Sequence, residues 1–313
     1  MKVLVTGSSG LIGSAVCQFL AAKGHEPVTM DVRPSPIKDF SPRFHDITNL
    51  EELRKAVKNI DGIIHLAAVS RVIDAQRNPA LCHTVNVEGT KRILTALSEL
   101  QDPPWFVYGS SREVYGEPKS IPVAETHPLK PINIYGDSKV EAEKLLTETY
   151  MRHNAAAIIF RYSSVYGSVY DYQTRVIPAF IQGALIGEAL RVDCPEHVFD
   201  FTYVSDAAEA TNMGVEALKE GKITGIETLN VSPGRGTSLK ELVILVGEVT
   251  GKETITFRGE KRSYDVGRYV GDAHKLAAVL GYSCKTDLKE GLTQLCSEYK
   301  TFFQQGVDQF EDP

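Results

Sequence analysis

The chain has 313 residues, of which 42% are hydrophobic and 24% are charged, which is ordinary globular composition and enough length for one large and one smaller domain. The formal net charge of -6 and the absence of any run of lysine and arginine disfavour a nucleic-acid partner. The apolar runs are too short for a membrane helix. The five cysteines are scattered, which predicts reduced thiols in a cytoplasmic protein. The eight histidines show no ligand spacing, so no metal site is expected.

The first part of the chain alternates strand and helix patterns. Short apolar strands are expected at 2–6, 27–31, 62–68, 105–111 and 156–167, and helices at 11–24, 49–59, 79–100 and 134–154. Strands that are apolar throughout are typical of a parallel sheet with helices on both faces. Residues 1–166 are therefore predicted to form an α/β fold with a doubly wound parallel sheet, the Rossmann arrangement, which binds NAD.

The regular alternation ends after Gly167. Strand-like pieces and helices near 177–187, 240–251 and 272–282 are separated by loops rich in glycine, proline and charge. We interpret residues 167–313 as a smaller α/β lobe that binds substrate, and we expect residues from about 199 to 232 to return to the main sheet.

A glycine-rich turn from Thr6 to Gly13 joins the first strand to the first helix. Gly7 permits the tight turn, Gly10 lets backbone amides approach a pyrophosphate at the helix N-terminus, and Gly13 lets helix and strand pack closely. Such a turn alone is weak evidence, but here a strand precedes it and a helix follows it. The expected dinucleotide contacts are Gly7, Gly10, Leu11, Ile12 and Gly13.

Two acidic residues are placed to reach the adenosine half of a dinucleotide. Asp31 ends the second strand, where a carboxylate accepts hydrogen bonds from a ribose 2′-hydroxyl and repels a 2′-phosphate, so NAD is favoured over NADP. The alternative is that Asp31 is an ordinary loop residue. The nearby Arg33 weakens the preference for NAD over NADP. Asp46 and Ile47 lie in the loop where the adenine edge is expected.

A tyrosine and a lysine one helical turn apart are the candidate chemical centre. Tyr135 and Lys139 open the helix after the strand that ends in Ser111, so all three are expected at the carboxyl edge of the sheet. Taken alone, the spacing of Tyr135 and Lys139 is better explained by two neighbouring residues on a helix surface. A lysine about 5 Å away would lower the pKa of the phenol by roughly two units, and the positive charge of an oxidised nicotinamide could add a comparable amount. Tyr135 could then take a proton from a substrate hydroxyl while hydride leaves the same carbon and Ser111 hydrogen-bonds the oxygen.

Together with further short motifs, these features resemble the extended short-chain dehydrogenase/reductases, specifically the NAD-dependent sugar-nucleotide epimerase/dehydratase family. The motifs span nearly the whole chain: TGSSGLIG (6–13), HLAA (65–68), NVEGT (86–90), SSREVYG (110–116), YGDSK (135–139), RYSSVYG (161–167), VIPAFI (176–181), FDFTYVSDAAEA (199–210) and RSYDVGRYVGDAHKL (262–276). The resemblance implies an enzyme like UDP-glucose 4-epimerase, with NAD as cofactor, a nucleotide-sugar substrate and a catalytic triad of Ser111, Tyr135 and Lys139.

The resemblance also implies further contacts. Cofactor contacts are expected at Leu66, Ala67, Ala68, Tyr135, Lys139 and Asn86, although Asn86 equally fits a polar group inside a helix. Substrate contacts are expected at Ser70, Ser111, Arg112, Ser164, Pro178 and Arg262. Relatives pair through two helices, which implies a homodimer through residues 78–100 and the helix from Ile134. The outer faces of these helices carry Leu94, Leu97, Leu145 and Leu146, which core burial would explain equally well.

The residues beside Ser111 bear on the reaction. In the family, the C4 hydroxyl loses a proton and a hydride to give a 4-keto sugar; 4-epimerases return the hydride to the other face, while dehydratases and decarboxylases use additional acid–base groups. Arg112 and Glu113 stand where 4,6-dehydratases usually have an Asp–Glu pair, so the acid that protonates the leaving hydroxyl is absent. Because Glu113 could act as a base, a dehydratase or a uronic-acid decarboxylase is an alternative. Glu113 could instead form a structural or exposed pair with Arg112. A 4-epimerase needs neither residue, and we favour it.

Two departures from the family pattern keep further alternatives open. Phe199 stands where many relatives have an arginine that helps hold the substrate diphosphate, and Ser164 stands where asparagine is usual. Candidates to replace this cation are Arg191, Arg235 and Arg268. An NAD(P)-dependent reductase of a non-nucleotide substrate is therefore an alternative, and a dinucleotide-binding regulator without turnover is another.

Overall fold

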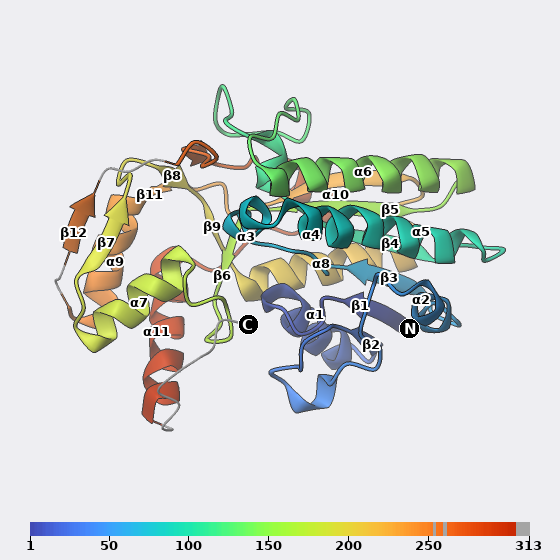
Figure 1. Ribbon diagram of the computed structural model, residues 1–313, viewed down its shortest axis with the longest axis horizontal. Coiled ribbons are helices and arrows are strands. Elements are labelled where there is room, and N and C mark those ends of the chain that lie inside the picture. Colours follow the sequence, from blue (N-terminus) through green and yellow to red (C-terminus); the bar gives the residue numbers. More distant parts are fainter. Residues whose placement is uncertain (253–254, 259–261, 305–313) are drawn as a thin grey trace.

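A six-stranded parallel sheet forms the larger part of the computed structural model, which describes residues 1–252, 255–258 and 262–304 (Figure 1). In the order β10-β5-β4-β3-β1-β2, its strands are β10 (Ile226–Val231), β5 (Ala157–Tyr162), β4 (Trp105–Ser111), β3 (Gly62–His65), β1 (Lys2–Thr6) and β2 (Glu26–Met30). The chain runs outward from β1 to β2 and then crosses to β3 on the other side of β1. The carboxyl ends of β1 and β3 thus frame the switch point at which such sheets bind ligands. The predicted doubly wound α/β fold is confirmed.

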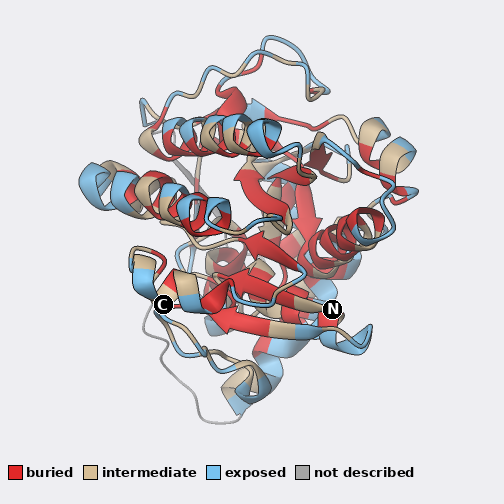
Figure 2. Cartoon of the chain, turned by 90° about the vertical axis from the view of Figure 1, so that its right-hand side faces the viewer, coloured by how far each residue is buried: buried red, intermediate tan, exposed pale blue. Residues whose placement is uncertain are grey.

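Helices cover both faces of the sheet because the strands are apolar on both faces. In β1, Leu4 packs on one face, Val3 and Val5 pack on the other, and all three are fully buried. The first face carries α2 (Leu50–Ala56), α5 (Thr90–Ser98) and α6 (Ile134–His153), and the second carries α1 (Leu11–Ala22), α8 (Val204–Lys219) and α10 (His274–Leu280). Figure 2 shows the buried strands in red between helices whose outer faces are exposed. Among the described residues, the structure contains no helix with the length and apolarity needed to cross a bilayer.

The segment expected as one helix from Pro79 to Leu100 is divided. An additional helix, α3 (Val72–Arg77), comes first. Next, α4 (Pro79–His83) is capped by Asn78, whose Oδ1 accepts a hydrogen bond from the Leu81 amide at 3.0 Å. A wider π-helical stretch, η2 (Thr84–Gly89), then connects α4 to α5.

The four leucines that the sequence left open between a dimer face and the core pack in the core. Leu94 and Leu97 of α5 and Leu146 of α6 are buried against the sheet, and Leu145 packs beside that cluster. Their hydrophobic surface is already covered within one chain, so these residues do not indicate an interface.

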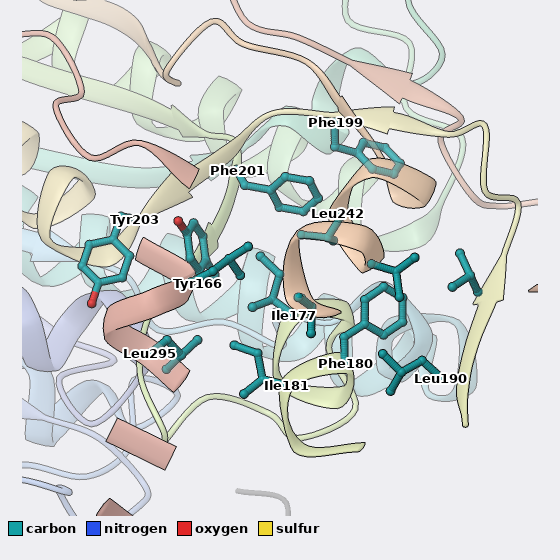
Figure 3. Packing of buried hydrophobic residues seen from close by; sticks show 14 of the residues in the cluster. Tyr166, Ile177, Phe180, Ile181, Leu190, Phe199, Phe201, Tyr203, Leu242 and Leu295 are labelled. Atoms are coloured by element: carbon teal, nitrogen blue, oxygen red, sulfur yellow. The ribbon is translucent and has the colours of Figure 1, made fainter. Parts of the chain in front are cut away.

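The smaller part has its own apolar core, which Figure 3 shows from close by. Ile177 and Phe180 of α7 meet Leu242 of α9 and Leu295 of α11 in this core. Its helices are α7 (Val176–Ile186), α9 (Leu239–Thr250) and α11 (Leu288–Gln304), and its strands are β6 (Ser164–Tyr166), β7 (Leu190–Asp193), β8 (Val198–Phe199), β9 (Phe201–Tyr203), β11 (Thr237–Ser238), β12 (Ile255–Arg258) and β13 (Arg268–Tyr269). Among these helices, α11 was not predicted from the sequence. Two short 3-10 turns lie in the first half of the chain, η1 (Lys38–Phe40) and η3 (Arg112–Tyr115).

Residues from the second half of the chain complete the first sheet. β10 pairs with β5 from Ile226 opposite Ala157 to Val231 opposite Tyr162. Just before it in the chain, α8 covers the same face of the sheet as α1. The functional division into residues 1–166 and 167–313 stays a prediction, and residues 305–313 of the expected lobe lie outside the described residues.

Candidate active site

A cavity of about 1240 Å³ opens at the carboxyl ends of β1 to β5 and is closed on one side by the smaller part. Pockets for one small molecule usually measure roughly 300–1,000 Å³, so this volume suits a dinucleotide together with a second ligand. Its wall contains every predicted contact residue except Asn86, namely Gly7, Gly10, Leu11, Ile12, Gly13, Asp31, Arg33, Asp46, Ile47, Leu66, Ala67, Ala68, Ser70, Ser111, Arg112, Glu113, Tyr135, Lys139, Ser164, Pro178 and Arg262. The fold thus brings these residues together, while their binding roles stay predictions.

The glycine turn packs directly against the sheet and the first helix. Gly7 has a φ of 70°, and a side-chain Cβ there would lie 2.6 Å from the Ala67 amide nitrogen. A Cβ at Gly13 would lie 2.0 Å from the Gly7 carbonyl oxygen. Only glycine fits both positions, and the N-terminus of α1 is therefore held at the cavity wall, where it favours an anion.

Asp31 connects the glycine turn to the end of β2. Its Oδ2 accepts a hydrogen bond from the Ser9 amide, and its Oδ1 accepts one from the Arg33 amide, both at 2.9 Å. Asp46 is fixed in a similar way, because its Oδ1 accepts from the Thr48 amide at 2.7 Å. Both carboxylates are thus oriented by the backbone beside the part of the cavity where the sequence analysis places adenosine.

Asn86 does not reach the cavity wall, contrary to the expected cofactor contact. Its side chain is buried, with Nδ2 donating to the Ser138 hydroxyl at 2.9 Å and Oδ1 accepting from the Val69 amide at 2.8 Å. It therefore ties the loop after β3 to α6. The structural alternative that the sequence left open describes Asn86 better, since every one of these contacts is internal.

Ser111, Tyr135 and Lys139 meet where β4 ends and α6 begins. Asn133 caps α6 by accepting the Gly136 amide at 2.8 Å, which sets Tyr135 in the first turn. Interaction with the Ser111 hydroxyl lowers the pKa of Tyr135, and the Lys139 Nζ lies 5.8 Å from the centre of the Tyr135 ring. The same Nζ donates to the Gly109 carbonyl at 2.8 Å. The three predicted catalytic side chains therefore share one corner of the cavity.

The charges around Tyr135 differ from the sequence prediction. Burial raises the pKa of Tyr135 to about 12, and it is opposed first by the positive charge of Arg175 and then by the hydrogen bond with Ser111. Burial also lowers the pKa of Lys139 to about 8. The sequence prediction counted the charges of Lys139 and of an oxidised nicotinamide but not the desolvation of Tyr135 and Lys139, which acts in the opposite direction.

The loop at 168–175 supplies cavity residues that the sequence analysis missed. The ring of Tyr172 faces three guanidinium groups, with centre distances of 5.7 Å to Arg33, 4.9 Å to Arg71 and 5.5 Å to Arg175. Arg33 comes from the glycine-turn end of the cavity, and Arg175 acts on Tyr135 at the other end. This loop therefore follows the cavity between its two ends. A signal was available, because Arg175 directly precedes the VIPAFI motif.

Replacing Arg175 by methionine is expected to lower turnover at pH 7 by roughly tenfold, the effect of one pKa unit on a weakly ionised base. Without this cation the pKa of Tyr135 rises further, a smaller fraction is phenolate, and the rising limb of the profile of kcat against pH moves to higher pH. Arg175→Lys keeps the charge and is the matched control. A loss of the same size at every pH would contradict the electrostatic role.

Glu113 is engaged on both carboxylate oxygens. Arg112 Nη2 lies 3.0 Å from Oε1, and Asn133 Nδ2 donates to Oε2 at 2.7 Å. The carboxylate is also buried. Glu113 is therefore a buried carboxylate that pairs with the partly buried Arg112 at the cavity wall, and the pair is not an exposed one.

The three arginines proposed to replace the cation missing at position 199 lie outside the cavity wall. These arginines are Arg191, Arg235 and Arg268, whose side chains are 53%, 78% and 48% exposed, respectively. Each pairs with a carboxylate outside the cavity. The prediction was wrong because sequence proximity did not show which loops face the cavity. The guanidinium that lies against Phe199, at 4.4 Å from the ring centre, belongs to Arg112.

Among the residues that the structure describes, one group of potential metal ligands lies outside the cavity, although the sequence showed no ligand spacing there. Cys194, Glu196 and His197 share the turn between β7 and β8, and one ligand atom from each lies within 4.8 Å of the others. None of the three lines the cavity, and we give this group no part in the reaction.

Comparison with known proteins gives one consistent relationship. Residues 3–231 match the model of the NAD dependent epimerase/dehydratase family. A UDP-glucose 4-epimerase of Rhizobium leguminosarum bv. trifolii is 31% identical over 92% of this chain and 94% of its own.

Solved structures agree with this relationship. The fold is similar to that of UDP-glucose 4-epimerase from Thermotoga maritima with UDP-glucose (TM-score 0.86, 27% identity, 97% of this chain and 100% of that one). It is also similar to UDP-glucuronic acid 4-epimerase from Bacillus cereus with UDP-glucuronic acid and NAD (TM-score 0.87, 27% identity, 96% and 100%). These matches confirm the predicted family and its NAD cofactor. Since the family model covers well over half of the sequence, the chain belongs to the NAD dependent epimerase/dehydratase family.

Proposed function

We propose that this protein is a nucleotide-sugar 4-epimerase that acts on a UDP-hexose through a transient 4-keto sugar. The observation that carries this proposal is the position of Ser111, Tyr135 and Lys139 in the same cavity as the glycine turn and Asp31. The names of the relatives support both the reaction and the UDP group.

The residues of the cavity suit the dinucleotide and the proton transfer. The glycine turn would hold the pyrophosphate, Asp31 the adenosine ribose and Lys139 the nicotinamide ribose. NAD, when bound, supplies a reversible hydride acceptor. Tyr135 takes the proton from the C4 hydroxyl and later returns it, and Ser111 holds the same oxygen by a hydrogen bond. The charge of Arg175 favours the phenolate that this step requires.

Glu113 separates epimerisation from the alternatives that need another base. Its two oxygens are already paired with Arg112 and Asn133, which favours a structural role. We therefore expect Glu113→Gln to keep 4-epimerase activity within roughly tenfold, because no step of epimerisation uses this carboxylate. A dehydratase or decarboxylase that depends on Glu113 would lose activity, and NMR analysis of the products shows which outcome occurs.

The proposed reaction is tested directly with UDP-glucose, UDP-glucuronic acid and the corresponding GDP-, CDP- and dTDP-sugars. Conversion at C4, followed by NMR, with NAD bound to the purified protein and no net change of absorbance at 340 nm is the expected result. A stoichiometric absorbance change would instead identify a reductase that releases its cofactor. Absence of any conversion across this panel would contradict the proposal.

We also propose a cytoplasmic homodimer. Cys17, Cys82, Cys284 and Cys296 are thiols, the usual state in a reducing compartment. Pairing through residues 78–100 and α6 would cover Met151, whose side chain is 70% exposed. Light scattering of the purified protein checks the dimer, and a monomer at micromolar concentration would contradict it.

A further inference from the structure

The ammonium of Lys139 is buried with few polar partners. Lys139 is 2% exposed, and among the described residues its Nζ forms no ion pair and donates one hydrogen bond, to the Gly109 carbonyl at 2.8 Å. Burial of a cation away from water is costly unless other groups compensate. This cost lowers the pKa of Lys139 to about 8, so the groups around Nζ decide whether the side chain stays charged at neutral pH.

The titratable groups near Lys139 give its charge limited support. Cys82 of α4 and Glu143 of α6 favour the ammonium, but both effects are smaller than the effect of burial. Burial keeps Cys82 a neutral thiol by raising its pKa, and the Glu143 carboxylate already pairs with Arg161 at 2.7 Å. Burial and the charge of Lys139 lower the pKa of His65 in β3 to about 3, so this ring is neutral as well.

Two aromatic rings face the ammonium. Nζ lies 4.8 Å from the centre of the Tyr108 ring and 5.8 Å from the centre of the Tyr135 ring. The face of an aromatic ring attracts a cation, most strongly where water is excluded. Tyr108 is 1% exposed and belongs to the same core cluster as Ala142 and Leu146 of α6, the helix that carries Lys139. The nearer ring is therefore fixed by the core.

The two rings differ in what happens to them during the proposed reaction. Tyr135 alternates between phenol and phenolate, so its attraction for the ammonium changes within each turnover. Tyr108 remains a neutral phenol, because burial holds its pKa well above the ordinary value. It is also not among the residues of the cavity wall, so substrate and cofactor do not compete for its ring. Tyr108 thus offers Lys139 a constant contact.

We propose that Tyr108 is a positioning residue, whose ring face holds Lys139 in place as an ammonium beside Tyr135. The strand β4 then holds Nζ twice, through the ring of Tyr108 and through the carbonyl of the next residue, Gly109. This inference rests on the proposed function, in which the charge of Lys139 supports the phenolate of Tyr135.

The test removes the ring and follows Lys139 in the NAD-loaded protein. In Tyr108→Leu we expect the pKa of Lys139 to fall by about one pH unit. NMR spectroscopy of the full chain with isotopically labelled lysine measures this pKa, and Lys139→Met assigns the resonance. The falling limb of the profile of kcat against pH with UDP-glucose should move to lower pH by the same amount, because the ammonium is lost earlier. An unchanged or higher pKa of Lys139 would overturn the proposal.

Two control variants separate the ring face from packing. Tyr108→Phe keeps the ring and should leave both the pKa of Lys139 and the pH profile unchanged. Phe106→Leu removes a fully buried ring from the same strand and core cluster, but this ring packs on Tyr150, with 5.5 Å between ring centres. It should destabilise the protein without moving the pKa of Lys139. An equal fall in Phe106→Leu, or in Tyr108→Phe, would assign the effect to something other than the ring face and end the proposal.

A further replacement covers the case in which Tyr108→Leu does not fold, as judged by circular dichroism. Trifluorophenylalanine in place of Tyr108 keeps the shape of the ring but weakens the negative charge on its face. The pKa of Lys139 should again fall, and no fall in this folded variant would contradict the proposal.

Failure of this inference is distinguishable from failure of the proposed function, because the pKa of Lys139 is measured without turnover. A fall in Tyr108→Leu, with no conversion of any sugar nucleotide by the original protein, leaves the inference standing and refutes only the 4-epimerase. Conversion of UDP-glucose, with the same Lys139 pKa in Tyr108→Leu as in the original protein, refutes only the inference.

Discussion

Replacing Tyr135 by phenylalanine is expected to lower turnover by roughly 10³-fold, within the range that one acid–base group contributes. The phenol hydroxyl is the group that accepts and returns the C4 proton, and Ser111 alone has no basic partner to replace it. The content of bound NAD should not change, because the ring that packs at the cavity wall is retained. Steady-state kinetics with UDP-glucose and the absorbance of released cofactor measure the two effects.

Tyr150 on the same helix provides a matched control. Its hydroxyl donates to the Pro104 carbonyl at 2.8 Å, and it lies outside the cavity wall. Tyr150→Phe should therefore retain full turnover while losing one buried hydrogen bond, about 1 kcal/mol of stability. Activity of Tyr135→Phe within tenfold of the original protein would exclude Tyr135 as the base.

Replacing Arg161 by methionine is expected to lower the free energy of unfolding by about 3–5 kcal/mol. Arg161 and Glu143 form a buried pair beneath the catalytic corner, with Nη2 to Oε2 at 2.7 Å and Nε donating to Oε1 at 3.0 Å. Removing the guanidinium leaves the Glu143 carboxylate buried without its counter-charge. Urea denaturation at pH 7 measures the loss.

A double variant distinguishes the unpaired charge from lost packing. Arg161→Met combined with Glu143→Gln removes both charges, so the double variant should be more stable than the sum of the single changes predicts. The exposed pair of Arg54 and Glu99 offers a comparison, since Arg54→Met should cost far less in solvent. A loss below about 1 kcal/mol for Arg161→Met would contradict the importance of the buried pair.

Local patterns explain which parts of the fold the sequence predicted. The first strand, the glycine turn and the first helix each depend on neighbouring residues, and they were placed correctly. Helix α11, which was not predicted, also carries a local pattern, with Leu288, Leu292, Leu295 and Tyr299 at helical spacing. The π-helical stretch between α4 and α5 had no comparable local signal.

Contacts between distant segments explain what the sequence could not predict at the site. Ser111, Tyr135 and Lys139 follow from motif spacing and the rule for carboxyl ends of strands. The stacking of Arg112 on Phe199 joins residues on two different parts of the fold. The pKa of Tyr135 is raised by burial within the whole fold and lowered by the charge of Arg175, which lies on another loop. Neither can be read from periodicity.

The pairing of β10 with β5 constrains how the protein can be made. Multi-domain chains generally complete the N-terminal unit first during synthesis. Here β5 remains an open edge until residue 231 has left the ribosome, so the nascent chain carries an unfinished nucleotide fold while β6, α7, β7, β8 and β9 of the smaller part emerge. Gene fragments that stop near residue 166 would expose this edge to aggregation, which makes the two parts inseparable as exchangeable modules.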